Sequence, residues 1–139
     1  MAGNVATPPP PEDPNIRNQW TNPHFRGLTP EAGTRSTAVA RAARLEVELV
    51  QKTGAGTVNW TAEEVAVIRQ SGRLPQGIVG HHISNVARMA GDPRNIMFVR
   101  GQQGNLQAHG GSFQNPTTGP LIDRRALIEA ATREVRDEV

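Results

Sequence analysis

The chain has 139 residues, the length of a single domain. It contains no cysteine, which excludes a disulfide framework and a thiolate metal site. The formal net charge is only +2, but every one of the 15 basic residues except Lys52 is an arginine. The planar guanidinium group of arginine can donate two hydrogen bonds to one phosphate, so this composition favours a polyanionic partner. An arginine preference of the coding genome explains the composition equally well. No apolar run is long enough to cross a bilayer, and no secretory leader opens the chain.

The first residues form a proline-rich, polar segment with four consecutive prolines, Pro8 to Pro11. Such a run favours an extended polyproline II conformation without a packed core. We therefore expect residues 1–14 to be a flexible leader or linker to something upstream. Residues 15–139 are expected to form one domain.

Two helices are predicted in the next part of the chain. The first covers residues 35–52, and we expect its Arg and Glu residues on the solvated face. The second covers residues 60–71, where Thr61 can cap the helix while Glu64 reaches back to it. The apolar face of the first helix repeats every three or four residues: Ala38, Ala42, Leu45 and Leu49.

Residues 74–111 hold three of the four histidines. A short extended run delivers His81 and His82, and a loop with one helical turn follows. Residues 95–99 read as a second strand, which the glycines at 101–104 are expected to break. A short helix should then carry Asn105 and His109.

A last helix is predicted over residues 123–139. Asp123 is a suitable N-cap, and helical spacing places Leu127 or Ile128 on the inner face. The order of elements predicts an α+β fold.

The residue types in this region suit a divalent metal and proton transfer. Adjacent residues on a strand point to opposite faces, so His81 can hold an ion while His82 takes a proton from water. Asn105 and His109 are four residues apart on a helix and can converge on the same ion. Asn95 can hydrogen-bond across the loop and hold His82 in place.

Three arginines near the proposed site can bind phosphate groups: Arg94, Arg100 and Arg124. Each can equally be a solvated surface charge.

Six short motifs resemble one known family in their order along the chain. The chain is similar to the HNH or ββα-metal endonucleases, and more closely to the Gly-His-His nuclease domains at the C-termini of Rhs-type and other polymorphic bacterial toxins. The motifs are Trp60-Thr61-x-Glu63-Glu64, Gly72-Arg73-Leu74-Pro75, Gly80-His81-His82-Ile83, Asp92-Pro93-x-Asn95-Ile96, Leu106-x-Ala108-His109-Gly110-Gly111 and residues 116–124.

The resemblance implies a mostly helical small α+β domain with a ββα-metal core, made of two short antiparallel strands and a helix, and with flanking helices. It implies metal-dependent hydrolysis of DNA. His81 and His109 would then be metal ligands, His82 the general base and Asn95 the residue that steadies the base.

The chain departs from the family pattern at Asn105, where members often have His. An amide oxygen ligates harder ions than imidazole does. The expected cofactor is therefore Mg²⁺ or Mn²⁺, with Ni²⁺ and Zn²⁺ as further candidates.

The resemblance also implies a cognate immunity protein and a parent delivery protein joined through the N-terminal linker. The domain would be a secreted or delivered effector that acts in the cytoplasm of a target cell. Two alternatives stay open, a nuclease that cuts RNA and a module that binds nucleic acid or protein without cleaving it.

Overall fold

The computed structural model describes residues 27–85, 87–111 and 119–137, with side chains described up to residue 134. The expected leader, residues 1–14, lies outside the described residues. The elements in chain order are α1 (Arg35–Thr53), α2 (Ala62–Ser71), β1 (Ile78–His82), η2 (Ala87–Met89), η3 (Pro93–Asn95), β2 (Ile96–Arg100), α3 (Gly101–Ala108) and α4 (Arg124–Asp137). None of the described helices is both long enough and apolar enough to span a membrane.

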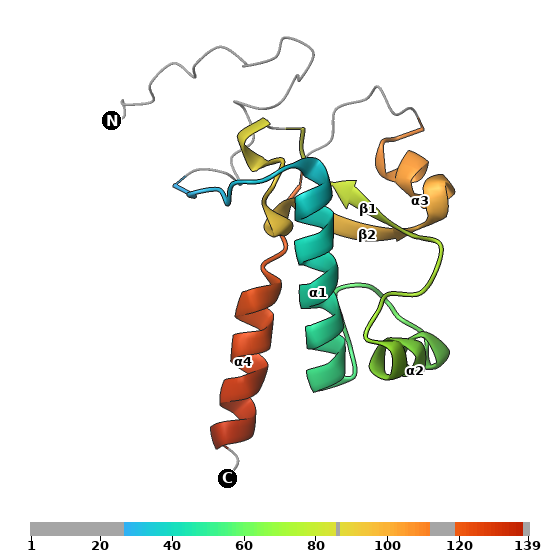
Figure 1. The fold of residues 1–139 in the computed structure, drawn as a ribbon, viewed down its shortest axis with the longest axis vertical. Helices are drawn as coiled ribbons and strands as arrows, with labels where there is room; N and C mark the ends of the chain where they lie inside the picture. Colours follow the sequence, from blue (N-terminus) through green and yellow to red (C-terminus); the bar gives the residue numbers. More distant parts are fainter. Residues whose placement is uncertain (1–26, 86, 112–118, 138–139) are drawn as a thin grey trace.

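Helix α1 lies at the centre of the domain, and Figure 1 shows it between α4 on one side and the hairpin and α2 on the other. Thr34 caps its start by accepting a hydrogen bond from the Thr37 amide. Gly54 ends the helix in the left-handed conformation, with φ of 79°. The helix predicted over 35–52 is therefore confirmed.

Helix α2 begins with the capping box that the sequence predicted. The Thr61 hydroxyl accepts from the Glu64 amide at 3.1 Å, and the Glu64 carboxylate accepts from the Thr61 amide at 2.9 Å. Gly72 ends the helix with φ of 69°. Local capping of this kind stabilises a helix by about 1 kcal/mol.

Strands β1 and β2 form an antiparallel pair in which His81 lies opposite Met97 and His82 lies opposite Ile96. One face of this hairpin packs on α1. Figure 1 shows α3 against the hairpin on the side away from α1. The buried residues of this packing are Ala38, Ala42, Ile96 and Phe98, and a second cluster between α1 and α2 contains Val47, Val50, Trp60 and Ile68.

Strand β2 ends at Arg100, so the break expected at residues 101–104 is confirmed, but no loop separates the strand from the next helix. Helix α3 begins directly at Gly101, which has φ of 66°, and Gly104 lies inside the helix. Residue 104 leaves little room for a side chain, because a Cβ there would lie 3.3 Å from Cβ of Val99, which would have to shift by a few tenths of an ångström. The glycines therefore let the chain turn out of β2 at once and pack α3 closely on the hairpin.

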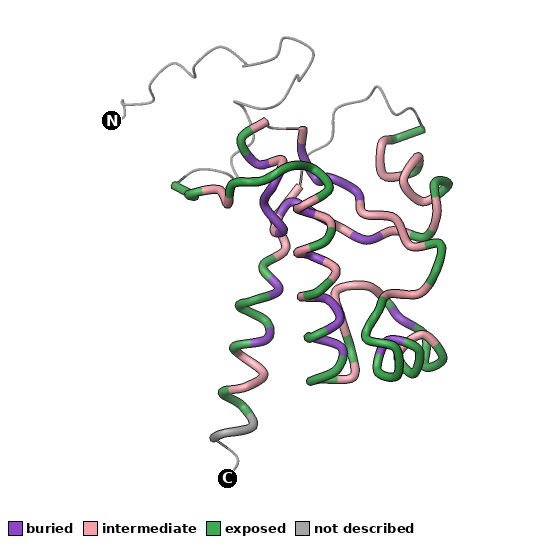
Figure 2. The backbone as a smooth tube through the Cα atoms, in the orientation of Figure 1, coloured by how far each residue is buried: buried purple, intermediate pink, exposed green. Residues whose placement is uncertain are grey.

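Helix α4 packs along α1, as Figure 1 shows. The Asp123 carboxylate accepts from the Ala126 amide at 3.0 Å, which confirms the predicted cap. Of the two inner-face candidates, Ile128 is buried, whereas Leu127 is 47% exposed. The burial colours of Figure 2 follow this one-sided pattern along both helices.

The expectation that the charged residues of α1 lie on its solvated face is wrong for Glu46. Its side chain is fully buried and forms an ion pair with Arg124 of α4. Its carboxylate also accepts hydrogen bonds from Thr57 and from the indole N–H of Trp60. The observed fold is a mostly helical small domain with a hairpin packed against a helix, as predicted.

Candidate active site

Gly80 sets how closely the hairpin lies on α1. A Cβ at this position would lie 2.8 Å from a methyl carbon of Val39, a distance that requires one of the two to move. The glycine before the two histidines therefore lets β1 rest on the helix. Because successive strand residues face opposite sides, His82 shares the α1 face with Gly80 and His81 faces α3.

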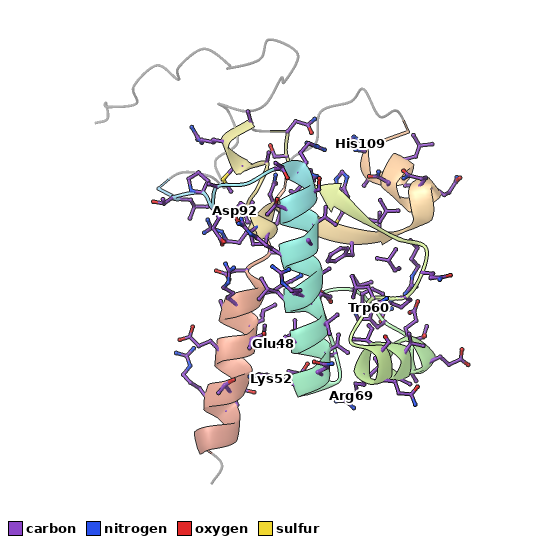
Figure 3. The ribbon with its side chains drawn as sticks, viewed as in Figure 1. Glu48, Lys52, Trp60, Arg69, Asp92 and His109 are labelled. Carbon is purple, nitrogen blue, oxygen red and sulfur yellow. The ribbon has the colours of Figure 1, made fainter. Side chains whose placement is uncertain are left out.

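His81 meets two side chains from the end of α3. Its Nδ1 lies 2.9 Å from Oδ1 of Asn105, and its ring lies edge-on to the His109 ring at 4.8 Å between centroids and 89° between planes. Figure 3 shows His109 at the end of α3 that is nearest the tip of β1. Burial lowers the pKa of His81, and this outweighs the hydrogen bond with Asn105, so the ring is neutral at pH 7.

The amide of Asn105 is oriented by its second contact. Its Nδ2 donates to Oε1 of Gln102 at 3.3 Å, which turns Oδ1 toward His81. Oδ1 can only accept, so in this arrangement Nδ1 of His81 carries the proton.

His82 faces the opposite side of the hairpin and is held by a backbone carbonyl. Its Nε2 donates to the Ala90 carbonyl at 3.2 Å. In a neutral ring with the proton on Nε2, Nδ1 carries the lone pair. Burial lowers the pKa of His82 to about 4, with a smaller contribution from the charge of Arg35. The ring is therefore in its basic form at neutral pH.

Asn95 is fully buried behind His82 and ties the two ends of the intervening loop together. Its Oδ1 accepts from the Ser84 amide at 3.0 Å, and its Nδ2 donates to the Ser84 carbonyl at 2.9 Å and the Met89 carbonyl at 3.4 Å. Ser84 follows His82 by two residues, and Met89 precedes Ala90. Asn95 thus fixes both the end of β1 that carries the His82 ring and the turn that carries the Ala90 carbonyl, the acceptor for that ring.

Each of the three arginines predicted to bind phosphate is paired with a carboxylate. The Arg94 guanidinium donates to Asp92 at 2.6 Å, and Arg100 forms a two-pronged ion pair with Glu64. These carboxylates raise the pKa of both arginines, and the Arg100 hydrogen bond lowers the pKa of Glu64 to about 2. Arg100 also lies at the other end of the hairpin from His82, about 13 Å along the strands.

Arg124 lies inside the protein. Its side chain is 1% exposed, and its guanidinium donates to Glu46 at 2.7 Å and to the Ile96 carbonyl at 3.0 Å. A phosphate contact at this residue would require the buried network to open.

Arg35 was not among the predicted site residues, yet the packing places it beside the histidines. Gly80 contacts Val39, His82 lies two residues further along the same face of β1, and Arg35 lies one helical turn before Val39. Its positive charge accordingly lowers the pKa of both His81 and His82, after the larger effect of burial. The four-residue spacing from Val39 is visible in the sequence, but the contact with β1 is not.

A mostly apolar cavity of about 280 Å³ borders His81 on the α3 side of the hairpin. Met97, Ala108 and Ile122 are among its other lining residues. The imidazole therefore borders a space large enough for a small ligand.

Two antiparallel strands that pass directly into a helix, with histidines on the first strand and at the helix end, make up a ββα core. This architecture defines a class of small nuclease domains. Residues 32–100 match the family described as the GHH signature containing HNH/Endo VII superfamily nuclease toxins. The chain belongs to this family of nuclease toxin domains through that segment.

The family match contains His81, His82 and Asn95 and ends at Arg100. Asn105 and His109 lie beyond it. No curated protein and no solved structure matches the chain.

Nucleases of the HNH family usually use a divalent metal ion, and the side chains around His81 suit one. His81 Nδ1 and Asn105 Oδ1 share a hydrogen bond at 2.9 Å, and the His109 ring lies against His81. The two atoms could both turn a lone pair toward an ion if the proton of the His81 ring moved from Nδ1 to Nε2. Over the described ranges no group of three or more His, Asp or Glu side chains is placed to hold an ion, and the fitting donor set is two imidazoles with one amide.

Proposed function

We propose that this domain is a metal-dependent endonuclease toxin that hydrolyses phosphodiester bonds of DNA. The observation that supports the proposal is that the two histidines of β1 lie on opposite faces and have different partners. His82 has its Nε2 on a backbone carbonyl, while His81 on the other face meets Asn105 and His109. One histidine is thus oriented to take a proton, and the other lies in a donor set for an ion.

His82 acts as the general base in this proposal. The neutral His82 ring takes a proton from a water molecule as the water oxygen forms a bond to phosphorus. The bond from phosphorus to the leaving oxygen breaks, and the leaving oxygen gains a proton from solvent. A pKa of about 4 keeps the ring unprotonated before substrate arrives, and an anionic phosphate beside it raises the pKa toward the useful range.

His81, His109 and Asn105 hold the divalent ion, for which Mg²⁺ or Mn²⁺ is proposed. When bound, the ion supplies positive charge that stabilises the leaving oxygen. The protein fixes the geometry: Gln102 orients Asn105, and Asn105 orients His81. Asn95 acts as a positioning residue for His82 through Ser84 and the turn that ends at Ala90. Placement of this kind contributes orders of magnitude in rate.

A nuclease toxin is delivered to target cells, and we propose that this domain acts in their cytoplasm as an antibacterial effector. A free nuclease would damage its producer, so a cognate immunity protein is part of the proposal, as is a parent delivery protein upstream of the leader. An immunity protein with an acidic face would complement the many arginines of this chain.

The function is tested by incubating the purified chain with plasmid DNA and with RNA in Mg²⁺, Mn²⁺, Ni²⁺ or Zn²⁺. We expect nicked and linear DNA with Mg²⁺ or Mn²⁺, and no products after a chelator is added. Products from RNA alone would show that the substrate assignment is wrong. Salt-sensitive DNA binding without products under any of the four ions would identify a binding module instead.

Replacing Asn105 with histidine is expected to change the metal preference. The variant has two imidazoles four residues apart at the end of α3, and imidazole favours Zn²⁺ and Ni²⁺ over Mg²⁺. We expect the affinity for Zn²⁺ to rise by at least about tenfold, the scale on which a metal-site contact acts, with little change for Mg²⁺. Titration calorimetry on the metal-free protein measures both.

Gln107→His is the matched control for this variant. It adds the same ring to α3 two residues away, on a face that does not adjoin residue 105. An equal gain in Zn²⁺ affinity in both variants would show that position 105 is not part of the ion site.

A further inference from the structure

Arg35 carries a positive charge that its own helix does not compensate. It is the first residue of α1, where the helix dipole already favours anions, and the first turn contains no acidic residue. Among the described residues, the ion pairs to carboxylates involve other cations. Arg94, Arg100 and Arg124 each have such a partner, so their charges are already satisfied within the protein.

The environment of Arg35 is intermediate between solvent and core. The residue is exposed, yet surrounding protein atoms lower the pKa of its guanidinium. Partial removal of water strengthens the attraction of a cation for an anion. The side chain thus remains reachable from outside while its charge is less screened than that of a fully solvated arginine.

The location of Arg35 is fixed by packing along α1. Ile78 packs against the clusters in the middle of α1, and Gly80 contacts Val39. Moving along β1 toward His82 therefore moves toward the start of the helix. Arg35 lies one turn before Val39, which brings its positive charge to the strand end that carries the paired histidines.

We propose that the Arg35 guanidinium binds a backbone phosphate of the nucleic acid at the His81–His82 site. The forked donors of arginine match two oxygens of one phosphate, and the contact would hold that phosphate beside the base. Arg35 thereby supplies the anion contact that the three carboxylate-paired arginines are not placed to make. The inference rests on the proposed nuclease function for its chemistry, while phosphate binding can be measured without any cleavage.

The test compares Arg35→Gln with Arg44→Gln. Arg44 is exposed on the same helix, and a separation of nine residues places it on the opposite face. Binding of a short DNA duplex is measured with chelator present at a series of salt concentrations. We expect Arg35→Gln to reduce the slope of log affinity against log salt by about 0.9, the value for one lost phosphate contact. Arg44→Gln is expected to leave the slope unchanged.

Cleavage kinetics add a second readout. Arg35→Gln is expected to lower kcat/KM by about 10-fold to 100-fold, the range for a charge-assisted hydrogen bond. Arg35→Lys should restore the salt slope but only part of the rate, because lysine keeps the charge and loses the fork. The thermal midpoint of Arg35→Gln should be unchanged or slightly higher, since a cation at a helix start is unfavourable.

The two proposals fail in different ways. If wild type binds DNA and never cleaves it, the nuclease function is wrong and the salt slope still decides the role of Arg35. If the slope is the same for wild type and Arg35→Gln, or if the chain does not bind DNA, the phosphate contact is wrong whatever the cleavage assay shows.

Discussion

Replacing His82 with alanine is expected to slow phosphodiester cleavage by about 10²-fold to 10⁴-fold, the usual contribution of a general base. The same change is expected to leave the affinity for divalent ions unaltered. His82 shares the face of β1 that packs on α1, whereas His81 faces α3 and meets Asn105 and His109. Removing the proposed base therefore leaves the proposed donor set for the ion in place.

The measurement pairs a plasmid-cleavage time course with calorimetric titration of Mn²⁺. His109→Ala is the complementary variant, because it should lose ion affinity and cleavage together. His82 is buried, so His82→Asn, which retains a polar side chain, and a thermal unfolding curve for each variant separate lost chemistry from lost folding. Cleavage by folded His82→Ala at the wild-type rate would show that another group activates the water.

Local signals in the sequence were sufficient for several parts of the fold. The Thr61 and Glu64 pair predicted the capping box of α2, and both of its hydrogen bonds are present. The alternation of strand side chains predicted that His81 and His82 face opposite sides, as the register shows. Each of these features depends on residues within a few positions of one another, where backbone geometry leaves few alternatives.

Contacts between distant segments could not be predicted in the same way. Glu46 looked like a surface residue of an amphipathic helix, and its partner Arg124 lies 78 residues away. Arg35 can be recognised as a residue near the histidines only when the packing of β1 on α1 is known. Its four-residue spacing from Val39 is also found for solvated residues of a helix. Gly101 looked like a break between two elements, whereas its positive φ lets α3 follow β2 directly.

Removing the Arg124 guanidinium is expected to lower the free energy of unfolding by about 3–5 kcal/mol, the cost of leaving a buried charge without its partner. The Arg124 side chain is 1% exposed and that of Glu46 is 0% exposed. In Arg124→Met the Glu46 carboxylate keeps only its hydrogen bonds from Thr57 and Trp60. The methionine fills the space, so the loss comes mainly from the unpaired carboxylate.

The control for this variant is Arg125→Met, one residue further along α4. Arg125 pairs with Glu31 at the surface and is 52% exposed, so its removal should cost less than about 1 kcal/mol. Adding Glu46→Gln to Arg124→Met should recover part of the loss, because the buried charge is then gone. Urea unfolding measures all of these variants. Equal losses for Arg124→Met and Arg125→Met would contradict the burial argument.

The stability of wild type should also fall in acid through Glu46. Burial raises the pKa of Glu46, but hydrogen bonds from Thr57, Arg124 and Trp60 outweigh it, so the pKa lies below its ordinary value of 4.5. A carboxyl group whose pKa is lower in the folded state contributes stability to the protein. This contribution is complete above the pKa of the unfolded state and is lost as the pH falls through the pKa of the folded state. Arg124→Met removes one of these hydrogen bonds, so its stability should depend less steeply on pH below about 4.5.

Arg124 also connects this buried pair to the site. Its guanidinium donates to the Ile96 carbonyl at 3.0 Å and the Pro93 carbonyl at 3.4 Å, which lie on either side of Asn95. Arg124→Met should therefore slow cleavage through kcat, by displacing Asn95, which we propose positions His82, while the salt slope of DNA binding stays at the wild-type value. A reduced salt slope with unchanged stability would instead mean that Arg124 reaches phosphate, as its sequence position first suggested.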